Sequence, residues 1–271
     1  MIRVAEIVNF LEVLAPPTLA EEWDNVGLLV GDGTKNVSAL MTCLTLSPDV
    51  AAEAVRRHAE MIVTHHPVLF RPVQRLTSET VEGRMLLELI GKGIAVFSSH
   101  TGYDSAKNGI NQQLAELFQL HDIQALRPIP NNEHSDHTTE KPAQGAGRCG
   151  ILPEPMSLGD FLEHVKAKLE IDPLQFVGNE SLTIEKIGIA CGSAAEFLPD
   201  AQNKNCQVLL TGEARFHACF EAVALDIALV LAGHYATERP AIERLAEILQ
   251  KQFPKLDVWA SESETDPLNY R

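Results

Sequence analysis

Apolar residues along this chain alternate between the spacing of amphipathic helices and the short continuous runs of buried strands. The helical spacing predicts helices over residues 4–14, 47–60, 81–90, 108–120, 157–169, 216–225 and 237–250. The apolar runs predict strands over residues 26–30, 39–46, 61–64, 95–98, 184–191, 208–211, 229–232 and 256–260. Strands that alternate with helices of about 10 to 15 residues are typical of an α/β fold with a parallel or mixed sheet.

One polar segment interrupts this alternation. Residues 131–147 combine Asn, Glu, His, Ser, Asp, Thr, Lys, Pro and Gly, and no apolar period runs through them. A polar stretch of this length is typical of a functional loop or a disordered segment. We therefore expect an excursion near a domain boundary, followed by a second α/β passage.

The composition is that of a soluble globular protein, and it limits the function classes. The 271 residues carry a formal net charge of −15, which argues against a nucleic-acid surface because phosphate binding requires clustered lysines and arginines. No apolar run approaches the roughly 20 residues that span a bilayer, and Glu6 and Asn9 make the start of the chain unlike a signal peptide. The five cysteines contain no CxxC pair, which favours buried thiols in a reducing compartment. We expect a cytoplasmic protein.

Histidines and acids gather directly after three of the expected strands. The clusters are His65-His66, His100 with Asp104, and His234 with Glu238. Open α/β sheets place their chemistry at the carboxyl ends of strands, so these segments can contribute to one site. The set suited to metal binding consists of His65, His66, Asp104, His234 and Glu238. Three imidazoles and two carboxylates exceed what one tetrahedral zinc requires, which makes a pair of metal ions conceivable.

The His65-His66 pair can share one ion only if the chain turns after its strand. Neighbouring residues within a strand point to opposite faces of the sheet. Pro67 requires the strand to end and restricts the backbone of His66, so that both rings can then be aimed into one cavity. The alternative is that one histidine is satisfied in the core and the other lies on the surface.

The other two clusters also have structural explanations. Asp104 can bridge two cations, with Gly102 permitting a sharp turn before it, or it can cap the helix that follows. His100 is expected either as a ligand or as a partner that orients another group. His234 and Glu238 are four residues apart at the start of a helix, so both can reach one ion. Alternatively, Glu238 only stabilises its own helix through the dipole.

Two further residues are candidate proton carriers near such a site. Glu213 and His217 follow the strand expected over residues 208–211, and each can equally have a structural role. The segment at residues 31–35 lacks the spacing of a phosphate-binding loop and predicts a hairpin turn. The sequence contains no Gly-x-Ser-x-Gly elbow and no cysteine in a recognisable nucleophile motif.

Five motifs of this chain resemble one protein family and occur in its order. They are EWDNVGL at residues 22–28, THHPVLFRP at 64–72, His100-Thr101 with Asp104, TGEARFH at 211–217 and GHYATERP at 233–240. The family is that of the Nif-three-like dinuclear metal centre proteins, often labelled GTP cyclohydrolase 1 type 2 homologues. The similarity covers nearly the whole chain, and the chain resembles the short form without an additional central domain.

The resemblance implies two α/β domains with mixed sheets and a metal site in the cavity between them. The first domain would comprise residues 1–125 and 232–271, and the second residues 126–231 with the polar loop 131–147. The family's ligands to two divalent ions fall on His65, His66, Asp104, His234 and Glu238. The resemblance also implies a ring-shaped homohexamer. Residues 107–109 and 191–194 depart from the family's usual glycine-rich turns, which affects the shape of the substrate pocket.

The leading hypothesis is a metal-dependent hydrolase. Asp104 or Glu238 would bridge two divalent ions, the three histidines would complete their coordination, and a metal-bound water would be the nucleophile. Glu213 or His217 would move the proton. Mixed imidazole and carboxylate ligands suit zinc, iron or manganese. The substrate would be a nucleotide or a small phosphorylated or cyclic amide compound.

The alternative hypothesis is a non-catalytic metal-binding protein with a regulatory or interaction role. The same ligands would serve either function, but an open coordination position that holds water would favour the hydrolase because structural metal sites are closed. A third hypothesis is nucleic-acid binding through the central hole of a ring. It would require local basic patches such as Arg56-Arg57 to outweigh the net negative charge.

Overall fold

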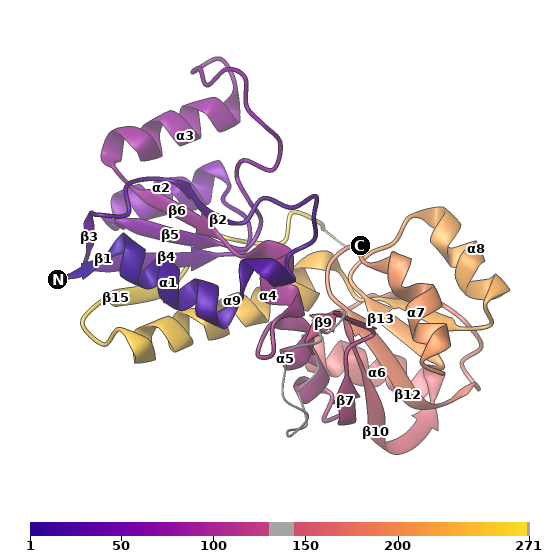
Figure 1. The fold of residues 1–271 in the computed structure, drawn as a ribbon. Helices are drawn as coiled ribbons and strands as arrows, with labels where there is room; N and C mark the ends of the chain where they lie inside the picture. Colours follow the sequence, from indigo (N-terminus) through magenta and orange to yellow (C-terminus); the bar gives the residue numbers. More distant parts are fainter. Residues whose placement is uncertain (130–143, 270–271) are drawn as a thin grey trace. The chain divides into compact units, whose positions relative to one another are not determined.

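A computed structural model describes residues 1–129 and 144–269, which form two compact units (Figure 1). Unit 1 comprises Met1–Tyr103 and Arg239–Pro267, and unit 2 comprises Asp104–Glu238 and Leu268–Arg271. The chain passes from one unit to the other inside α4 (His100–Ser105), inside α9 (His234–Gln252) and again after Pro267. None of the helices in the described ranges is long and apolar enough to cross a membrane.

The sheet of unit 1 has five strands in the order β15-β4-β5-β6-β2. Their bounds are Asp257–Ala260 for β15, Ala39–Cys43 for β4, Met61–Thr64 for β5, Ala95–Ser98 for β6 and Gly27–Val30 for β2. The first four strands run parallel, whereas β2 pairs antiparallel with β6. Because the parallel strands share one direction, the residues that follow β5 and those that follow β6 lie at the same edge of the sheet.

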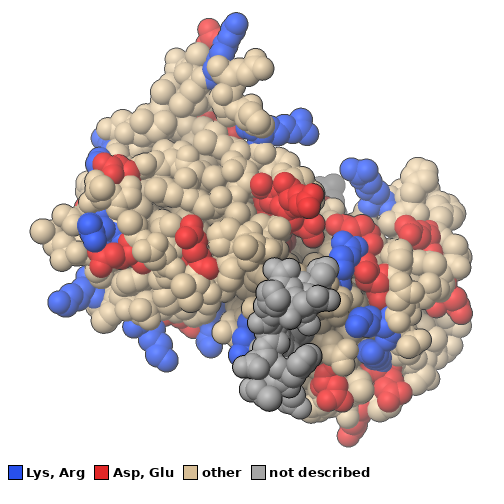
Figure 2. Space-filling view, in the orientation of Figure 1, with Lys and Arg blue, Asp and Glu red and all other residues tan. Residues whose placement is uncertain are grey.

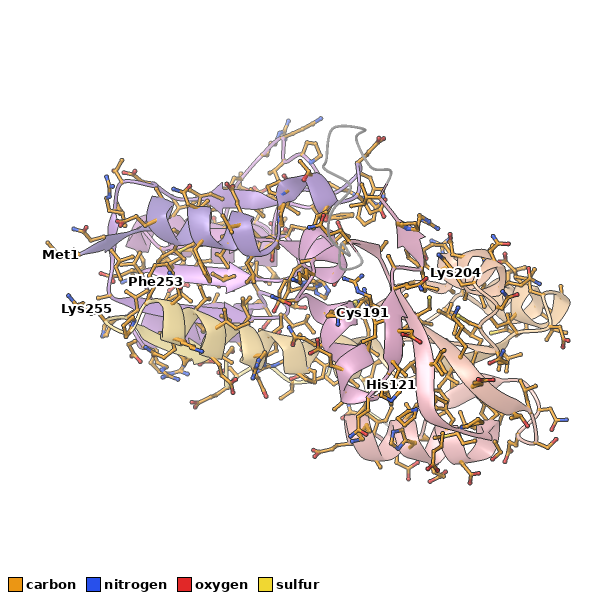
Figure 3. The ribbon with its side chains drawn as sticks, turned by 60° about the horizontal axis from the view of Figure 1, so that its bottom comes forward. Met1, His121, Cys191, Lys204, Phe253 and Lys255 are labelled. Carbon is orange, nitrogen blue, oxygen red and sulfur yellow. The ribbon has the colours of Figure 1, made fainter. Side chains whose placement is uncertain are left out.

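Helices cover both faces of this sheet (Figure 1). The helices are α1 (Val4–Leu14), α2 (Pro48–Arg56), α3 (Val81–Lys92) and the part of α9 that belongs to unit 1. Helices α2 and α3 pack on a buried cluster that includes Val50, Leu86 and Trp259. On the other face, Phe10 of α1 contacts Phe253 with ring centroids 5.6 Å apart. Phe253 lies directly beyond α9 (Figure 3). Two short strands, β1 (Ile2–Arg3) and β3 (Asn36–Val37), pair antiparallel beside α1.

The ends of these helices follow from their sequences. In α1 the buried residues Val4, Ile7 and Leu11 recur at helical spacing, and the helix ends before two consecutive prolines, of which the second opens a short 3-10 turn (Pro17–Leu19). The hydroxyl of Ser47 caps α2 by accepting a hydrogen bond from Val50 N. The helix ends at Arg56 rather than near residue 60, because His58 adopts a left-handed φ of 57°. The turn predicted at residues 31–35 is not a hairpin, because β2 and β3 pair with different strands.

A buried carboxylate joins the last segment of the chain to unit 1. Glu53 of α2 accepts hydrogen bonds from Trp259 Nε1 at 3.1 Å, Ser261 Oγ at 2.7 Å and Ser263 N at 2.8 Å. Burial raises the pKa of Glu53, but the hydrogen bonds from Ser261, Ser263 and Glu262 N outweigh it and lower that pKa to about 2. The carboxylate is therefore ionised throughout the physiological range and fixes the chain after β15.

The sheet of unit 2 has six strands in the order β11-β14-β13-β12-β10-β7. Their bounds are Gln175–Val177 for β11, Ala228–Leu231 for β14, Val208–Thr211 for β13, Thr183–Ala190 for β12, Arg148–Ser157 for β10 and His121–Gln124 for β7. Strands β12, β13 and β14 run parallel, and the other three pair antiparallel. Helices α7 (Leu198–Asn203), preceded by a 3-10 turn (Ala195–Phe197), and α8 (Phe216–Ala224) share one buried cluster with this sheet. Helix α6 (Leu158–Leu169) contacts the segment after α5 (Ile110–Leu117) through Phe161 and Phe118, with ring centroids 6.0 Å apart.

Strand β10 was not predicted from the sequence, which left residues 148–156 without an element. Pro153 and Pro155 interrupt its apolar pattern, and proline cannot donate to a strand ladder. The register of β10 against β12 shifts between Ile151 and Met156, so the prolines lie at an irregularity of the ladder. The strand is thus compatible with its prolines only because the pairing breaks around them.

Arg148, at the start of β10, is a fully buried cation. Its Nη1 donates to the carbonyls of Gly145 and Gly147, and its Nη2 donates to the carbonyls of Ser105 and Ala106 at 3.3 and 2.8 Å. Burial lowers the pKa of Arg148 to about 10, so the group keeps its charge at neutral pH. A positive charge at the C-terminal end of a helix is favourable, and this one anchors the end of α4.

The predicted α/β class with mixed sheets is confirmed, and the unit boundaries differ from the expected ones. The chain divides at 103/104 and 238/239 instead of 125/126 and 231/232. The reason is that α5 packs in unit 2, where Asn111, Leu114 and Ala115 are buried.

Of the polar loop predicted at residues 131–147, residues 131–143 lie outside the described residues. Gly145–Ala146 forms the short strand β9, which pairs with β8 (Arg127–Pro128).

Because the pKa of the buried Glu53 is lowered, we expect its contribution to the free energy of unfolding to depend on pH. Glu53→Gln should destabilise the protein by on the order of 3 kcal/mol at pH 7. Because the pKa is lowered from 4.5 to about 2 in the folded state, this contribution is complete above pH 4.5 and is lost as the pH falls toward 2. Urea unfolding of both proteins at pH 7 and pH 3 should show that their difference narrows at the lower pH. Glu88→Gln, an exposed position on α3, is the control, and an equal difference at both pH values would contradict the assignment.

Candidate metal centre

Unit 1 brings three imidazoles together at the carboxyl edge of its sheet. His65 and His66 follow β5, and His100 opens α4 just beyond β6. The ring centroids are 5.1 Å apart for His65 and His66, 5.2 Å for His65 and His100, and 5.6 Å for His66 and His100. One ring nitrogen from each residue lies within 4.8 Å of the others. Three imidazoles at this spacing are a donor set that can bind one metal ion.

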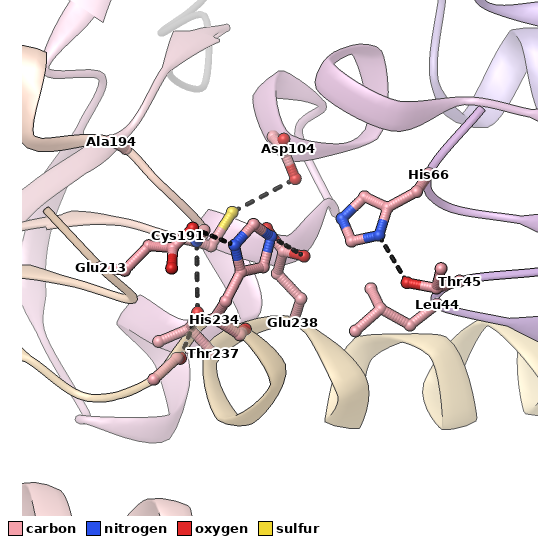
Figure 4. Close-up of polar contacts among 12 residues, drawn as sticks. Leu44, Thr45, His66, Asp104, Cys191, Ala194, Glu213, His234, Thr237 and Glu238 are labelled. Atoms are coloured by element: carbon pink, nitrogen blue, oxygen red, sulfur yellow. Dashed lines mark hydrogen bonds and ion pairs between the residues drawn. The ribbon is translucent and has the colours of Figure 1, made fainter. Parts of the chain in front are cut away.

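The backbone beyond β5 explains how two neighbouring histidines can share this group. His65 N donates to Cys43 O and His66 N donates to Leu44 O, both at 2.9 Å, so the ladder with β4 continues past the strand. The Thr45 hydroxyl lies 2.7 Å from Nδ1 of His66, which leaves the Nε2 side of that ring for a ligand (Figure 4). His65 is only 2% exposed, whereas His66 is half-buried. The pair is therefore held at a strand end, as the sequence predicted, and both rings lie within one cluster.

Asp24 holds His100 in place. Its carboxylate lies 2.7 Å from His100 Nδ1 and accepts hydrogen bonds from Thr101 N at 3.1 Å and from Thr101 Oγ1 at 2.5 Å. Burial raises the pKa of Asp24, but the hydrogen bonds from His100 and Thr101 outweigh it and lower that pKa to about 2. A carboxylate on one ring nitrogen orients an imidazole and leaves the other nitrogen for a metal.

In unit 2, His234 lies between two carboxylates at the start of α9. Its Nε2 is 3.0 Å from Glu238 Oε2, and its Nδ1 is 3.0 Å from Glu213 Oε1 (Figure 4). The hydrogen bond to the buried Glu238 and the second one to Glu213 raise the pKa of His234 to about 9. A proton and a metal ion therefore compete for this group, because a metal ligand must be neutral imidazole.

The start of α9 differs from the expected one. The helix begins at His234 rather than Thr237, so His234 and Glu238 both belong to its first turns and Pro240 lies inside the helix. The Thr237 hydroxyl is within hydrogen-bond distance of the carbonyls of Gly233 and His234, and it accepts a hydrogen bond from Gly192 N at 3.2 Å. These hydrogen bonds stabilise the first turn of α9. The helix therefore begins before Thr237, and Pro240 does not mark its start.

Asp104 belongs to a second polar network of unit 2. The Cys191 thiol donates to Asp104 Oδ1 at 3.2 Å (Figure 4). The buried amide of Asn111 joins the same two residues through their backbones. Asn111 Nδ2 donates to Asp104 O at 3.1 Å, and Asn111 Oδ1 accepts from Cys191 N at 2.8 Å. Burial, together with the charges of Asp104 and Glu238, raises the pKa of Cys191, so its thiol stays protonated. Figure 3 shows Cys191 at the end of β12.

The two candidate proton carriers lie in different surroundings. Glu213 is exposed and contacts His234, and it borders a pocket of about 300 Å³ that Gly212, Gly233 and Pro173 also line. His217 is exposed on α8, where its ring contacts Phe216 with centroids 6.2 Å apart. The structure thus joins Glu213 to a candidate ligand and places His217 on the surface of a helix. A second pocket of about 330 Å³ in unit 1 is lined by His66, Thr45 and Met85.

A protein-family model described as Duf34/NIF3 (NGG1p interacting factor 3) matches residues 2–267. The chain belongs to this family. It is 31% identical to a protein named GTP cyclohydrolase 1 type 2 homolog from Clostridium acetobutylicum, over 100% of this chain and 99% of that protein. It is 29% identical to NIF3-like protein 1 of Drosophila melanogaster, over 98% of this chain and 88% of that protein.

Solved structures share the fold of this chain. A Bacillus cereus protein related to NIF3 superposes with a TM-score of 0.89 at 23% identity, covering 100% of this chain and 99% of that one, which supports the shared fold. Reduced HcgD from Methanocaldococcus jannaschii gives a TM-score of 0.79 at 29% identity, covering 96% and 98% of the two chains. The resemblance expected from the five motifs is confirmed.

Three residues around the donors of this NIF3 protein were not identified as functional from the sequence. Asp24 and Asn111 orient donors through hydrogen bonds, and Cys191 was expected only as a small buried hydrophobe. Asp24 lies inside the EWDNVGL motif, which was the available signal for it. Asn111 and Cys191 have no such signal, because the contact between them joins residues 80 positions apart.

The close packing of Gly192 against Glu238 and His234 leads to a testable prediction about metal affinity. Gly192 has a left-handed φ of 66°, and a Cβ there would collide with Glu238 Oε1 and approach His234 Nε2 to 3.3 Å. Gly192→Ala should therefore weaken metal binding at least about tenfold, because backbone strain and the clash both displace the carboxylate. Titration with zinc against a competing chelator measures this. Gly91→Ala, where a Cβ meets nothing within 4 Å, is the control, and equal affinities of both variants would contradict the prediction.

Proposed function

We propose that this NIF3 protein binds two divalent metal ions and uses them to hydrolyse a small nucleotide, phosphorylated or cyclic amide compound. The observation that carries the proposal is the imidazole group of His65, His66 and His100, with ring nitrogens within 4.8 Å of one another. The donors of unit 2, His234, Glu238 and Asp104, would supply the carboxylates that the imidazoles lack.

The chemistry of the donors supports borderline metal ions. Imidazole and carboxylate together suit zinc, iron or manganese, whereas magnesium and calcium prefer oxygen ligands alone. Two of the imidazoles have a carboxylate on their other nitrogen, Asp24 for His100 and Glu213 for His234. Metal-binding histidines in proteins commonly have such a partner, which fixes the ring and its tautomer.

The residues around the donors support hydrolysis of a small compound. Bound divalent cations would supply Lewis-acid catalysis and an activated water. Glu213 is exposed beside His234, where its carboxylate can hold a proton released in the reaction. The pockets of about 300 and 330 Å³, which border Glu213 and His66, are within the size range of small-molecule sites. Relatives named GTP cyclohydrolase 1 type 2 homolog are consistent with a nucleotide as the substrate.

The charge distribution argues against nucleic acid as the ligand. On the face shown in Figure 2, lysines and arginines are scattered among acidic side chains, and the described residues of that face form no broad basic area. We infer that the protein acts on small molecules and that it does so in the cytoplasm. We also propose that it assembles as a homohexamer. Light scattering of the purified protein at several concentrations tests the assembly.

Replacement of Glu238 tests the metal centre. Glu238→Gln removes one negative charge beside His234, so we expect the metal content to fall by at least one ion per chain and hydrolysis to fall at least about a hundredfold. Elemental analysis of protein purified without added metal gives the first value, and a panel of nucleotides and phosphoesters gives the second. The control is Glu247→Gln, an exposed position on the same helix. Unchanged metal content together with unchanged hydrolysis would end the proposal.

One further outcome separates catalysis from metal binding alone. Loss of metal in Glu238→Gln with no turnover by the wild-type protein on any compound of the panel would favour the regulatory or interaction protein.

A double-mutant cycle that combines Glu238→Gln with His66→Ala tests whether donors of the two units serve the same ions. Coupling between the two losses of affinity would support one centre, and additive losses would support separate centres.

A further inference from the structure

Two large aromatic rings of unit 1 are exposed beside the imidazole group. Trp23 is 59% exposed and Phe70 is 46% exposed, although side chains of this size usually bury most of their surface. Their ring centroids are 5.8 Å apart in an edge-to-face arrangement. His100 contacts both, with its ring centroid 6.1 Å from that of Trp23 and 6.3 Å from that of Phe70. His100 is therefore common to an aromatic cluster and to the imidazole group.

Hydrogen bonds of neighbouring residues hold the backbone segments that carry these two exposed rings. Asn25 Nδ2 donates to Leu69 O at 2.6 Å, which joins the segment of Trp23 to the segment of Phe70. Asp24, the residue after Trp23, is joined to His100 and Thr101 by the bonds described above. Glu21 N donates to Thr101 Oγ1 at 3.0 Å on the other side of Trp23. The two loops are thus joined to each other and to the start of α4, and the rings contact one another and His100.

A preorganised, exposed aromatic pair is suited to stacking on a planar ring. We propose that Trp23 and Phe70 form a stacking subsite for a planar heteroaromatic ring of the ligand, such as a nucleobase or a pterin. The ligand's other end would then reach the imidazoles of His65, His66 and His100. The inference rests on the proposed metal-dependent function for the role of those imidazoles, and it deepens that function by naming the class of ligand.

Other aromatic residues differ from Trp23 and Phe70 in burial or in surroundings. Trp259 is buried, and its Nε1 donates to Glu53, so its role is structural. Phe216 and Phe220 are exposed, but they are four residues apart on one face of α8 and contact each other along a helix surface. Trp23 and Phe70 come from separate loops, and both contact a candidate metal ligand.

Calorimetry with matched probes tests the subsite. The ring-bearing probes are GMP, AMP, UMP and 6-hydroxymethylpterin, and ribose 5-phosphate is the counterpart without a ring. At least one ring-bearing probe should bind the zinc-loaded protein tenfold or more tightly than ribose 5-phosphate. Trp23→Ala and Phe70→Ala should each weaken that binding by about 5- to 100-fold, because stacking on an aromatic side chain contributes this much per base. Trp23→Phe should recover most of the affinity, since phenylalanine keeps a stacking face.

The controls separate the subsite from the metal site. Zinc content should stay unchanged in Trp23→Ala and Phe70→Ala, and Phe216→Ala, an exposed aromatic of unit 2, should bind every probe as the wild type does. Binding that depends on Trp23 in a protein without hydrolytic activity would sustain the subsite and refute the hydrolase. Equal affinity for probes with and without a ring, no binding of any ring-bearing probe, or unaltered binding in both alanine variants would overturn the subsite whatever the hydrolytic activity.

Discussion

The carboxylate of Asp24 is the interaction on which the candidate site of unit 1 depends. His100 adopts a φ of 26°, a left-handed conformation that a non-glycine residue avoids because its Cβ crowds the backbone. Such a conformation persists only when the surrounding contacts over-determine it. Asp24 provides those contacts, since it bonds the ring of His100 and both the amide and the hydroxyl of Thr101. The direction of the imidazole, the start of α4 and the position of Trp23 all follow from this one group.

Both units use the same physical arrangement with different residues. In each unit, parallel strands end at one edge of a sheet, and the residues that follow them carry imidazoles and carboxylates. Each unit also provides an acid that orients a histidine, Asp24 for His100 and Glu213 for His234. In unit 1 the candidate donor His100 lies on α4, and in unit 2 His234 and Glu238 lie on α9. Donor positions on a helix vary less than donor positions on a loop.

Much of the fold could be predicted because its central elements have clear periods. The buried strands β5, β6 and β13 and the amphipathic helix α1 have the bounds that their patterns predict. Prediction failed where tertiary contacts override the local signal. The segment at His100 was expected as a sharp turn around Gly102, yet Asp24 and Arg148 make it a helix by bonding its two ends. The candidate donors could be named from their residue types and their positions after strands, whereas Asp24 and Asn111 act through partners that only the folded chain brings near.

The exposure of Trp23 and Phe70 bears on the choice between a hydrolase and a non-catalytic protein that only binds metal ions. Full burial of a large apolar side chain contributes roughly 1.5 to 3 kcal/mol, and these two rings forgo much of it while their neighbours hold them in place. A protein that only holds metal ions gains nothing from this arrangement, since imidazoles and carboxylates are sufficient for that role. A protein that must also hold an organic ligand beside the metal gains a stacking surface. The aromatic pair therefore favours a function in which the metal ligands act on a bound compound.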